Sequence, residues 1–407
     1  MAQIKAFKGL LYNGSKVEID KVITPPYDVI GEEMRSYFHN LSPYNIIKLI
    51  LNDSDSPYKE ARKVLNSWIE KEVLVADTDD AIYLYRQVFN YRGKSYNRYG
   101  FISLLKLEDP GSEILPHEKT YEGPKKDRFN LLIETEANLS PIFVAFSDKE
   151  KRLLDIFKKT EQTEAVFDFD FENVIHSFWK IIDTDIIDQF KEVLSDKYIL
   201  IADGHHRYEV ALNYRNLRRK ENSVSKEAPY DYVMSFFAPI EQEGLLILPT
   251  HRLVNLEVEI SVMLNKLSGY FEVIVCDNKE QLFNGLCHQK YPSFGLYVEN
   301  KFYLLKIKKS ANNDFVDKSD PLSKLDVVVF QNLILNNIFN YQSVVSYTQN
   351  EDEAIERVNS GEFNAAFLLR ATSMEQVVDV AEKKLLMPQK STYFYPKVLT
   401  GLLIHKF

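Results

Sequence analysis

The chain has 407 residues, which is too long for one small domain and predicts two or three compact lobes. A composition of 45% hydrophobic and 27% charged residues is typical of a globular protein that is soluble. The formal net charge of −9 argues against a general binder of nucleic acids or acidic membranes, since both require clustered cations. We therefore expect a small-molecule partner and neither a nucleic acid nor a membrane, with the oligomeric state left open.

The two cysteines, Cys276 and Cys287, lack the CxxC spacing of zinc sites and predict neither a metal centre nor a disulfide framework. Reduced thiols of this kind are typical of the cytosol. The first residues show no signal-peptide pattern, and no apolar run is long enough to cross a bilayer. These features together predict a cytoplasmic protein.

Short strands and turns are expected in residues 1–30, where Asn13-Gly14 is a hairpin signal. Pro25 and Pro26 force an extended backbone, so the following Tyr27 sits on a rigid loop. That loop is either a plain turn or one wall of a pocket. Helices are expected in residues 31–75, followed by two strands in residues 81–107 that are joined at Arg92-Gly93.

The next segment is rich in residues that handle phosphoryl groups. Prolines and a glycine favour a loop for its first part, and the apolar spacing after Phe129 predicts a helix with Asp127 and Arg128 near its start. Cations can neutralise phosphate oxygens, and a carboxylate or histidine can accept a proton. A solvated charged loop is the alternative. The candidate site residues here are His117, Glu118, Lys125, Asp127 and Arg128.

The stretch at 198–209 reads as strand, sharp turn and helix, with an amphipathic helix at 183–194 before it. Gly204 permits a tight turn at positive φ. The free N–H groups of the helix start make an anion site, to which Arg207 adds a planar fork of donors. Histidines can move protons, and Asp203 can hold Mg²⁺, orient His205 or simply cap the helix. The candidates are Asp203, Gly204, His205, His206 and Arg207, and no metal site is certain.

Beyond this motif, a hairpin is expected from the apolar runs at 232–239 and 245–248, ending in His251-Arg252 at a strand terminus where ligand groups often lie. A surface pair is the alternative for these two residues. Residues 255–308 predict a helix–strand–helix–strand–strand scaffold. A buried helix is expected at 325–339, a strand at 365–369, and a helix opened by a capping box of Thr372 and Glu375.

The segment 387–397 combines lysines, hydroxyls and aromatic residues in one extended stretch. The lysines can bind a carboxylate or phosphate, and the hydroxyls can donate hydrogen bonds to it. A strand with exposed lysines is the alternative. The candidates here are Lys390, Ser391, Thr392 and Lys397.

Asp203-Gly204-His205-His206-Arg207-Tyr208 resembles the nucleotide-binding box of the ParB/sulfiredoxin-like superfamily, and within it the free-serine kinases, whose equivalent turn cradles adenine-nucleotide phosphates. Over nearly its whole length the chain resembles the uncharacterised DUF1015 family, on the stretches 24–30, 117–128 and 387–397. The resemblance implies an α+β fold: a mixed-sheet ParB/sulfiredoxin-like core with an additional C-terminal α/β lobe. We expect a catalytic region at 1–253 and this lobe at 254–407.

The resemblance implies phosphoryl transfer on a small metabolite, serine or phosphoserine, because DUF1015 members are often encoded beside serine-biosynthesis enzymes. In a kinase form, Gly204 to Arg207 would hold the phosphates of ATP or ADP, with Mg²⁺ as a further cofactor. In a phosphatase form, water would attack phosphoserine with a histidine as acid and base. The alternative is a non-catalytic nucleotide-binding regulatory module. For the enzyme, we expect the 117–128 segment, the central turn and Lys390 to line one pocket.

Overall fold

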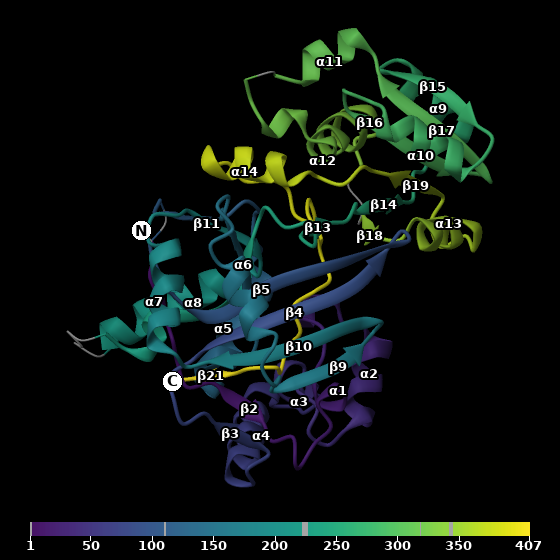
Figure 1. Cartoon of the computed structure of the whole chain (residues 1–407). Helices are drawn as coiled ribbons and strands as arrows, with labels where there is room; N and C mark the ends of the chain where they lie inside the picture. Colours follow the sequence, from purple (N-terminus) through teal and green to yellow (C-terminus); the bar gives the residue numbers. More distant parts are fainter. Residues whose placement is uncertain (1, 110, 222–226, 318, 342–344) are drawn as a thin grey trace. The chain divides into compact units, whose positions relative to one another are not determined.

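The computed structural model describes residues 2–109, 111–221, 227–317, 319–341 and 345–407. The chain forms two compact units, shown in Figure 1. Unit 1 contains Met1–Pro116, Thr120–Leu246 and Pro396–Phe407, and unit 2 contains His117–Lys119 and Ile247–Tyr395. The fold is mixed α+β, with a mixed sheet in unit 1 and a separate antiparallel sheet in unit 2. The functional division into 1–253 and 254–407 stays a prediction.

The large sheet of unit 1 has nine strands within the described residues, in the order β6-β11-β8-β12-β5-β4-β10-β9, with β1 paired to β5. The pairs β11–β6 and β12–β8 are parallel and the others are antiparallel. The strands are β1 (Ile4–Lys5), β4 (Ile82–Tyr91), β5 (Lys94–Lys106), β6 (Ile114–Leu115), β8 (Ile142–Phe146), β9 (Phe167–Phe171), β10 (Val174–Ile181), β11 (Ile199–Asp203) and β12 (Tyr232–Pro239).

Of three predicted hairpins, the structure confirms one and contradicts two. Arg92 and Gly93 both have positive φ, at 48° and 78°, as the tight turn between β4 and β5 requires. The hairpin predicted at Asn13-Gly14 is wrong, because β2 (Leu10–Tyr12) pairs with the distant β3 (Leu74–Ala76). The hairpin predicted after β12 is also wrong, because β12 pairs with β5 and β8.

The helices of unit 1 cover the sheet and build a second core beside it. One prediction is corrected here: α5 begins at Glu122, earlier than predicted, so Lys125 lies in the helix and Asp127 and Arg128 lie beyond its first turn. The pair Gly123-Pro124 is tolerated because the first turn needs no intrahelical N–H donors. The helices are α1 (Ile19–Val22), α2 (Glu32–Leu41), α3 (Ile47–Ile50), α4 (Pro57–Glu70), α5 (Glu122–Thr135), α6 (Leu154–Thr160), α7 (Thr184–Leu194) and α8 (His205–Glu221).

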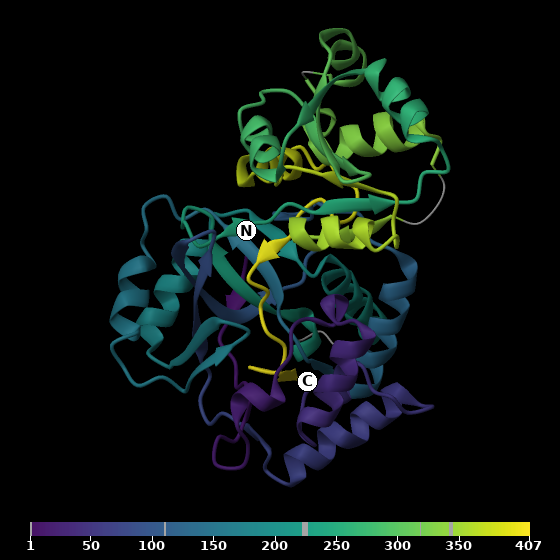
Figure 2. The ribbon, with the colours of Figure 1, turned by 90° about the vertical axis from the view of Figure 1, so that its right-hand side faces the viewer.

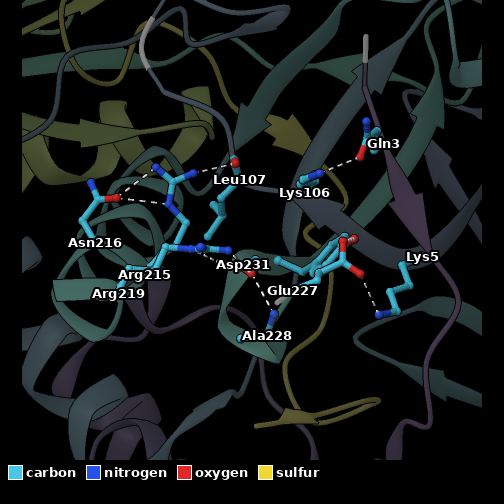
Figure 3. Close-up of polar contacts among 11 residues, drawn as sticks. Gln3, Lys5, Lys106, Leu107, Arg215, Asn216, Arg219, Glu227, Ala228 and Asp231 are labelled. Carbon is cyan, nitrogen blue, oxygen red and sulfur yellow. Dashed lines mark hydrogen bonds and ion pairs between the residues drawn. The ribbon is translucent and has the colours of Figure 1, made fainter. Parts of the chain in front are cut away.

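Helix α8 is fixed along the sheet by a polar network at its far end, shown in Figure 3. Arg219 donates two hydrogen bonds to the carboxylate of Asp231, at 2.7 and 2.6 Å, just before β12 begins. Burial raises the pKa of Asp231, but the bonds from Arg219 outweigh it and lower the pKa. One turn earlier, Arg215 donates to the carbonyl oxygen of Leu107, just after β5, at 2.7 Å. The contacts of Arg215 and Arg219 thus hold the C-terminal half of α8 against the ends of β5 and β12.

Residues 396–407 belong to unit 1, although the rest of that unit ends at Leu246. Figures 1 and 2 show this segment in yellow beside the large sheet. Its strand β21 (His405–Lys406) pairs with β7 (Ala137–Asn138). Thr24 and Thr400 exchange two backbone hydrogen bonds, at 3.1 and 2.8 Å. The segment is thus an integral part of the unit's core.

Unit 2 is built on an antiparallel sheet in the order β15-β17-β16-β19-β14-β18. The strands and helices predicted in residues 255–308 are confirmed. The elements are β14 (His251–Val254), α9 (Ile260–Ser268), β15 (Phe271–Cys276), α10 (Lys279–Cys287), β16 (Ser293–Val298), β17 (Lys301–Ile307), α11 (Lys309–Phe315), α12 (Asp326–Val329), η4 (Phe330–Ile338), β18 (Ser346–Thr348), α13 (Glu351–Asn359), β19 (Ala365–Leu368), α14 (Met374–Glu382) and β20 (Phe394–Tyr395).

Two local predictions in unit 2 are corrected. His251 and Arg252 open β14 instead of ending a strand. The capping box of α14 is formed by Ser373 and Gln376, one residue later than predicted, because Thr372 is buried and donates to the carbonyl oxygen of Ser391. Among the described helices, none is long and apolar enough to cross a membrane.

Candidate active site

The central motif forms the predicted strand, turn and helix. The apolar run of β11 is buried in the sheet, and Gly204 turns the chain at φ +90°, where only glycine is unstrained. A Cβ at this position would lie 3.0 Å from a guanidinium nitrogen of Arg207. The missing side chain of Gly204 therefore leaves the space in which Arg207 folds back over the turn.

Asp203, at the end of β11, is paired with a lysine from the distant segment 396–407. Nζ of Lys397 donates to Oδ2 of Asp203 at 2.7 Å, and the backbone N–H of Gly204 donates to Oδ1 at 2.7 Å. Burial alone would raise the pKa of Asp203. The charges of Lys397 and Arg207 outweigh it and hold the pKa well below its ordinary value. Asp203 is therefore an ionised carboxylate with both oxygens engaged.

Lys397 is held in place through its backbone. Nε2 of Gln87 donates to the carbonyl oxygen of Lys397 at 3.0 Å, and Arg98 donates to the preceding carbonyl oxygen, of Pro396. Arg98 is fully buried in the sheet, with its guanidinium over the rings of Phe143 and Phe236. Two side chains of the sheet thus set the position of the ammonium group beside Asp203.

A pocket of about 60 Å³ lies beside the start of α8. Arg207 lines this pocket. Its guanidinium donates to Oγ of Ser140 at 3.0 Å and to the carbonyl oxygen of Pro141. Arg128 reaches it from α5, with its guanidinium 4.2 Å from the ring centre of Tyr27. The volume suits a few water molecules or one small oxyanion. Two guanidinium groups on one small pocket favour a phosphate or carboxylate group.

Two further residues complete the pocket wall. Burial raises the pKa of Tyr27 to about 12, so its hydroxyl stays protonated and can donate. Oγ1 of Thr400 is buried and has no hydrogen-bond partner among the described residues. The pocket interpretation of the Pro25-Pro26 loop is supported by Tyr27. Sequence reasoning missed Ser140 and Thr400, since neither lies in a motif, and only their place in the fold brings them to the pocket.

The remaining candidates on α5 and α8 are tied into local contacts. Asp127 accepts from Nε of Arg128 at 2.7 Å and from the hydroxyl of Tyr58 at 2.8 Å. This carboxylate therefore orients Arg128. Lys125 forms ion pairs with Glu122 at 2.6 Å and Glu209 at 3.1 Å.

The two histidines of the motif differ in their surroundings. His205 is buried, and its charge is one of the influences that lower the pKa of Asp203. Nε2 of His206 accepts a hydrogen bond from the backbone N–H of Tyr121 at 3.0 Å. That contact joins the start of α5 to the start of α8, so the 120–128 segment and the central turn form one cluster in unit 1.

A second cluster of candidates forms within unit 2. Nε2 of His117 lies 3.0 Å from Oγ1 of Thr392, and Glu118 accepts from the backbone N–H of Lys390 at 3.2 Å. Arg252 donates to the carbonyl oxygen of Lys390 at 2.9 Å, and burial lowers the pKa of this arginine to about 10. The segments around 117 and 390 therefore meet, as predicted for two of the three stretches.

The other two candidates of unit 2 have structural contacts. Nδ1 of His251 accepts from the backbone N–H of Leu369 at 3.2 Å, and Oγ of Ser391 donates to the carbonyl oxygen of Pro388 at 2.6 Å. That the cluster of unit 2 shares one pocket with Asp203 stays a prediction.

Metal-ligating side chains do not gather in threes: no group of three or more His, Cys, Asp or Glu residues suited to a metal ion occurs in the described part of the chain. At Asp203 both oxygens are already engaged by Lys397 and Gly204. These contacts favour pairing with Lys397 over a role as a Mg²⁺ ligand.

Comparison with solved structures finds weak structural similarities. A conserved hypothetical protein from Pyrococcus furiosus is 14% identical, over 70% of this chain and 89% of that chain, with a TM-score of 0.35. A free serine kinase in complex with AMP is 13% identical, over 69% and 83%, with a TM-score of 0.37. SbnI with a C-terminal truncation, from Staphylococcus aureus, is 10% identical, over 74% and 85%, with a TM-score of 0.37.

Among curated proteins no match was found. The family model described as "Protein of unknown function (DUF1015)" matches residues 4–328, which is most of the chain. The resemblance carried by the stretches 24–30 and 117–128 is thereby confirmed, whereas the stretch 387–397 lies beyond the matched residues. The chain belongs to the DUF1015 family.

Proposed function

We propose that unit 1 transfers a phosphoryl group between an adenine nucleotide and the hydroxyl of a small metabolite of the serine type. The observation that carries this proposal is the ionised Asp203–Lys397 pair at the start of α8, the helix that also supplies Arg207 to the anion pocket. Residues 203–208 resemble the free-serine kinases and a ParB/sulfiredoxin-like core. An adenine nucleotide and serine are therefore the first ligands to test.

The anion pocket supplies what a phosphate group needs. Arg207 and Arg128 offer guanidinium donors from two different helices. Arg207 lies in the first turn of α8, where the helix dipole is positive. Tyr27 and Thr400 add neutral hydroxyls. At about 60 Å³ the pocket takes one phosphoryl group and not a whole nucleotide, so the rest of the nucleotide would lie outside it.

The proposed phosphoryl transfer uses the charged side chains beside the anion pocket. The substrate hydroxyl oxygen attacks the terminal phosphorus, the bond from that phosphorus to the bridging oxygen breaks, and the hydroxyl proton passes to Asp203. Asp203 is a weak base, because its pKa is held low. Phosphoryl transfer proceeds through a loose transition state that makes little demand on a base. The main contributions are therefore the positive charges of Lys397, Arg207 and Arg128 around the phosphoryl oxygens.

A non-catalytic nucleotide-binding module is the second candidate. It is favoured by one observation: both oxygens of Asp203 already accept hydrogen bonds, so a proton acceptor is not freely offered. A module of this kind needs the anion pocket but no base.

The test is a turnover assay with ATP or ADP and serine, following O-phosphoserine by mass spectrometry, with the reverse reaction run from O-phosphoserine. Wild-type protein is compared with Asp203→Asn and Arg207→Lys. We expect turnover to fall in Asp203→Asn with nucleotide binding retained, but by less than the ~10²-fold typical of a lost general base, because the loose transition state makes little demand on one. Arg207→Lys should weaken binding, because a lysine cannot reproduce the fork of donors.

A matched control is Arg152→Lys, which changes an exposed arginine whose described ion pair is with Glu192, outside the pocket. Nucleotide binding without turnover in either direction would favour the regulatory module. Neither binding nor turnover in a folded protein would remove the proposal.

A further inference from the structure

The sheet of unit 2 ends on one side in a strand that is open to pairing. Strand β15 (Phe271–Cys276) is the first in the order β15-β17-β16-β19-β14-β18, and in the described part of the chain it pairs with β17 alone. This pairing runs through all six residues of β15 without a bulge. The opposite side of such a strand presents a row of backbone donors and acceptors that a further strand can bind. We call this row the β15 edge.

The backbone groups of the β15 edge follow from the hydrogen bonds to β17. The backbone N–H of Lys308 donates to the carbonyl oxygen of Tyr270 at 2.9 Å. Hydrogen-bonded and non-hydrogen-bonded pairs alternate in an antiparallel ladder, so residues 272, 274 and 276 also bond to β17. The N–H and C=O groups that point away from β17 are therefore those of Phe271, Val273 and Val275.

The other outer strands of the two large sheets are protected against pairing, but β15 is not. Strand β9 carries the exposed carboxylates of Asp168 and Asp170, and β6 and β18 contain only two and three residues. Charge and short length are common ways to block an edge. Strand β15 has a single charged residue, Glu272, and no proline. Its Val275 is 63% exposed, more than any other large hydrophobic side chain in the described residues.

The sequence of β15 is suited to pairing with itself. In an antiparallel pair about a two-fold axis, the register that sets Val273 opposite Val273 of a second copy also sets Phe271 opposite Val275. All three residues of the β15 edge then exchange backbone hydrogen bonds. A shift by two residues in one direction would place two Glu272 side chains opposite each other, which is destabilising. A shift in the other direction would leave Phe271 opposite Asp277, outside the strand.

Charges at the two ends of the paired strands favour the same register. It sets Asp277 opposite Gly269 of the second copy, where the chain passes from α9 into β15. At this point the ammonium group of Lys308 donates to the carbonyl oxygen of Ser268 at 2.5 Å. Lys308 and Asp277 are both exposed, and within the described ranges neither takes part in an ion pair. The two-fold axis brings an aspartate toward a lysine twice, once at each end.

We propose that the β15 edge is a dimerisation surface, at which two copies of this chain pair through β15 in the register centred on Val273. The sheets of unit 2 in the two copies would then form one continuous antiparallel sheet, with Val275 covered beside Phe271 of the second copy. The proposal concerns unit 2 alone and does not depend on the phosphoryl transfer proposed for unit 1. Pairing of one strand buries little surface, so we expect a reversible dimer.

Sedimentation velocity of the full chain, from about 1 µM to about 1 mM, tests this proposal, and we expect a monomer–dimer equilibrium within that range. Val273→Pro removes an N–H group that points away from β17, a position at which edge strands tolerate proline. It should weaken association by about tenfold or more, because each copy loses a central hydrogen bond. Val275→Lys, at an exposed position, should also weaken association and does not alter the backbone.

Charge reversal tests the register. Lys308→Glu and Asp277→Lys should each weaken association severalfold, because each brings like charges together at both ends of the paired strands. The double variant Lys308→Glu/Asp277→Lys restores opposite charges and should regain most of the affinity. Ile175→Lys is the matched control, since it changes a 44% exposed hydrophobic side chain of unit 1 and should leave association unchanged. Circular dichroism and thermal unfolding check that each variant is folded.

Three outcomes would contradict the proposal. A wild-type protein that stays monomeric over the whole concentration range would leave the β15 edge to a partner other than a second copy. A dimer whose affinity neither Val273→Pro nor Val275→Lys changes would have its interface elsewhere. A double charge reversal that associates no better than the two single variants would exclude the register centred on Val273.

Discussion

Nζ of Lys397 lies 2.7 Å from Oδ2 of Asp203, across 194 residues of sequence. Both side chains are largely shielded from water, with exposed fractions of 12% and 20%. Shielding makes the two charges interdependent, since either one alone would be poorly solvated. The pair therefore couples the stability of unit 1 to the charge of its candidate site.

Removing one partner of this pair should destabilise the protein. Lys397→Met keeps most of the side-chain volume but leaves Asp203 as an uncompensated charge, so we expect the free energy of unfolding to fall by about 3–5 kcal/mol. Denaturant unfolding measures this change. The double variant Asp203→Asn/Lys397→Met should recover much of the loss while staying inactive in the turnover assay. Stability equal to wild type in Lys397→Met would show that the pair contributes little.

Substitution of the turn glycine should affect both stability and anion binding. Gly204→Ala places a Cβ at φ +90° and 3.0 Å from Arg207, so we expect a loss of about 1–2 kcal/mol in unfolding free energy and weaker phosphate binding. The matched control is Gly123→Ala in α5, where a Cβ would meet no heavy atom within 4 Å. That variant should leave stability unchanged or raise it by up to about 1 kcal/mol. Equal effects of the two substitutions would contradict the conformational argument.

Stability should fall in acid through a buried histidine. Nδ1 of His176 shares a hydrogen bond of 2.6 Å with the hydroxyl of Tyr85. Burial lowers the pKa of His176 to about 3. In the unfolded chain a histidine titrates near ~6.5. Above that pH both states are neutral. Below it only the unfolded state takes up the proton, so stability declines between about pH 6.5 and 3, at ~1.4 kcal/mol per pH unit.

Urea unfolding at pH 7 and pH 4.5 measures this decline. We expect His176→Gln, which keeps an acceptor for Tyr85, to lose about 2–3 kcal/mol less than wild type between these two pH values. His288→Gln changes an exposed histidine and serves as the control. An unchanged pH dependence in His176→Gln would assign acid sensitivity to other groups.

Duplex DNA should not bind at physiological salt, despite the resemblance of the central motif to ParB-type proteins. The net charge is −9, and affinity for the phosphate backbone requires clustered cations. Fluorescence anisotropy with a labelled duplex over a range of salt concentrations measures this. Binding that weakens steeply with salt would overturn the expectation.

Local patterns predicted the central turn well, because the requirement for positive φ at Gly204 and the buried strand before it are written in neighbouring residues. The start of α5 was predicted too late, since the sequence gives Gly123 and Pro124 the appearance of loop residues, whereas the first turn of a helix tolerates both. The register of β2 with β3 was also missed. Long-range pairing is decided by packing and leaves no local signal.

Contacts between distant segments also explain why only part of the candidate site could be predicted. Asp203 and Arg207 were found from their motif, but the partner of Asp203 could have been any of several lysines, and nothing near Lys397 in the sequence distinguishes it from Lys390. The distinction comes from Arg98 and Gln87, which hold the backbone at 396–397. Thr400 and Ser140 reach the pocket only through the sheet topology.

Because residues 396–407 complete unit 1, that unit cannot reach its final form before unit 2 has been synthesised. The ribosome must first make all of unit 2, since residues 247–395 precede this segment. Until then β7 lacks its partner strand and Asp203 lacks its ammonium group. A chain interrupted anywhere in unit 2 would therefore carry the entire central motif without Lys397, the partner of Asp203.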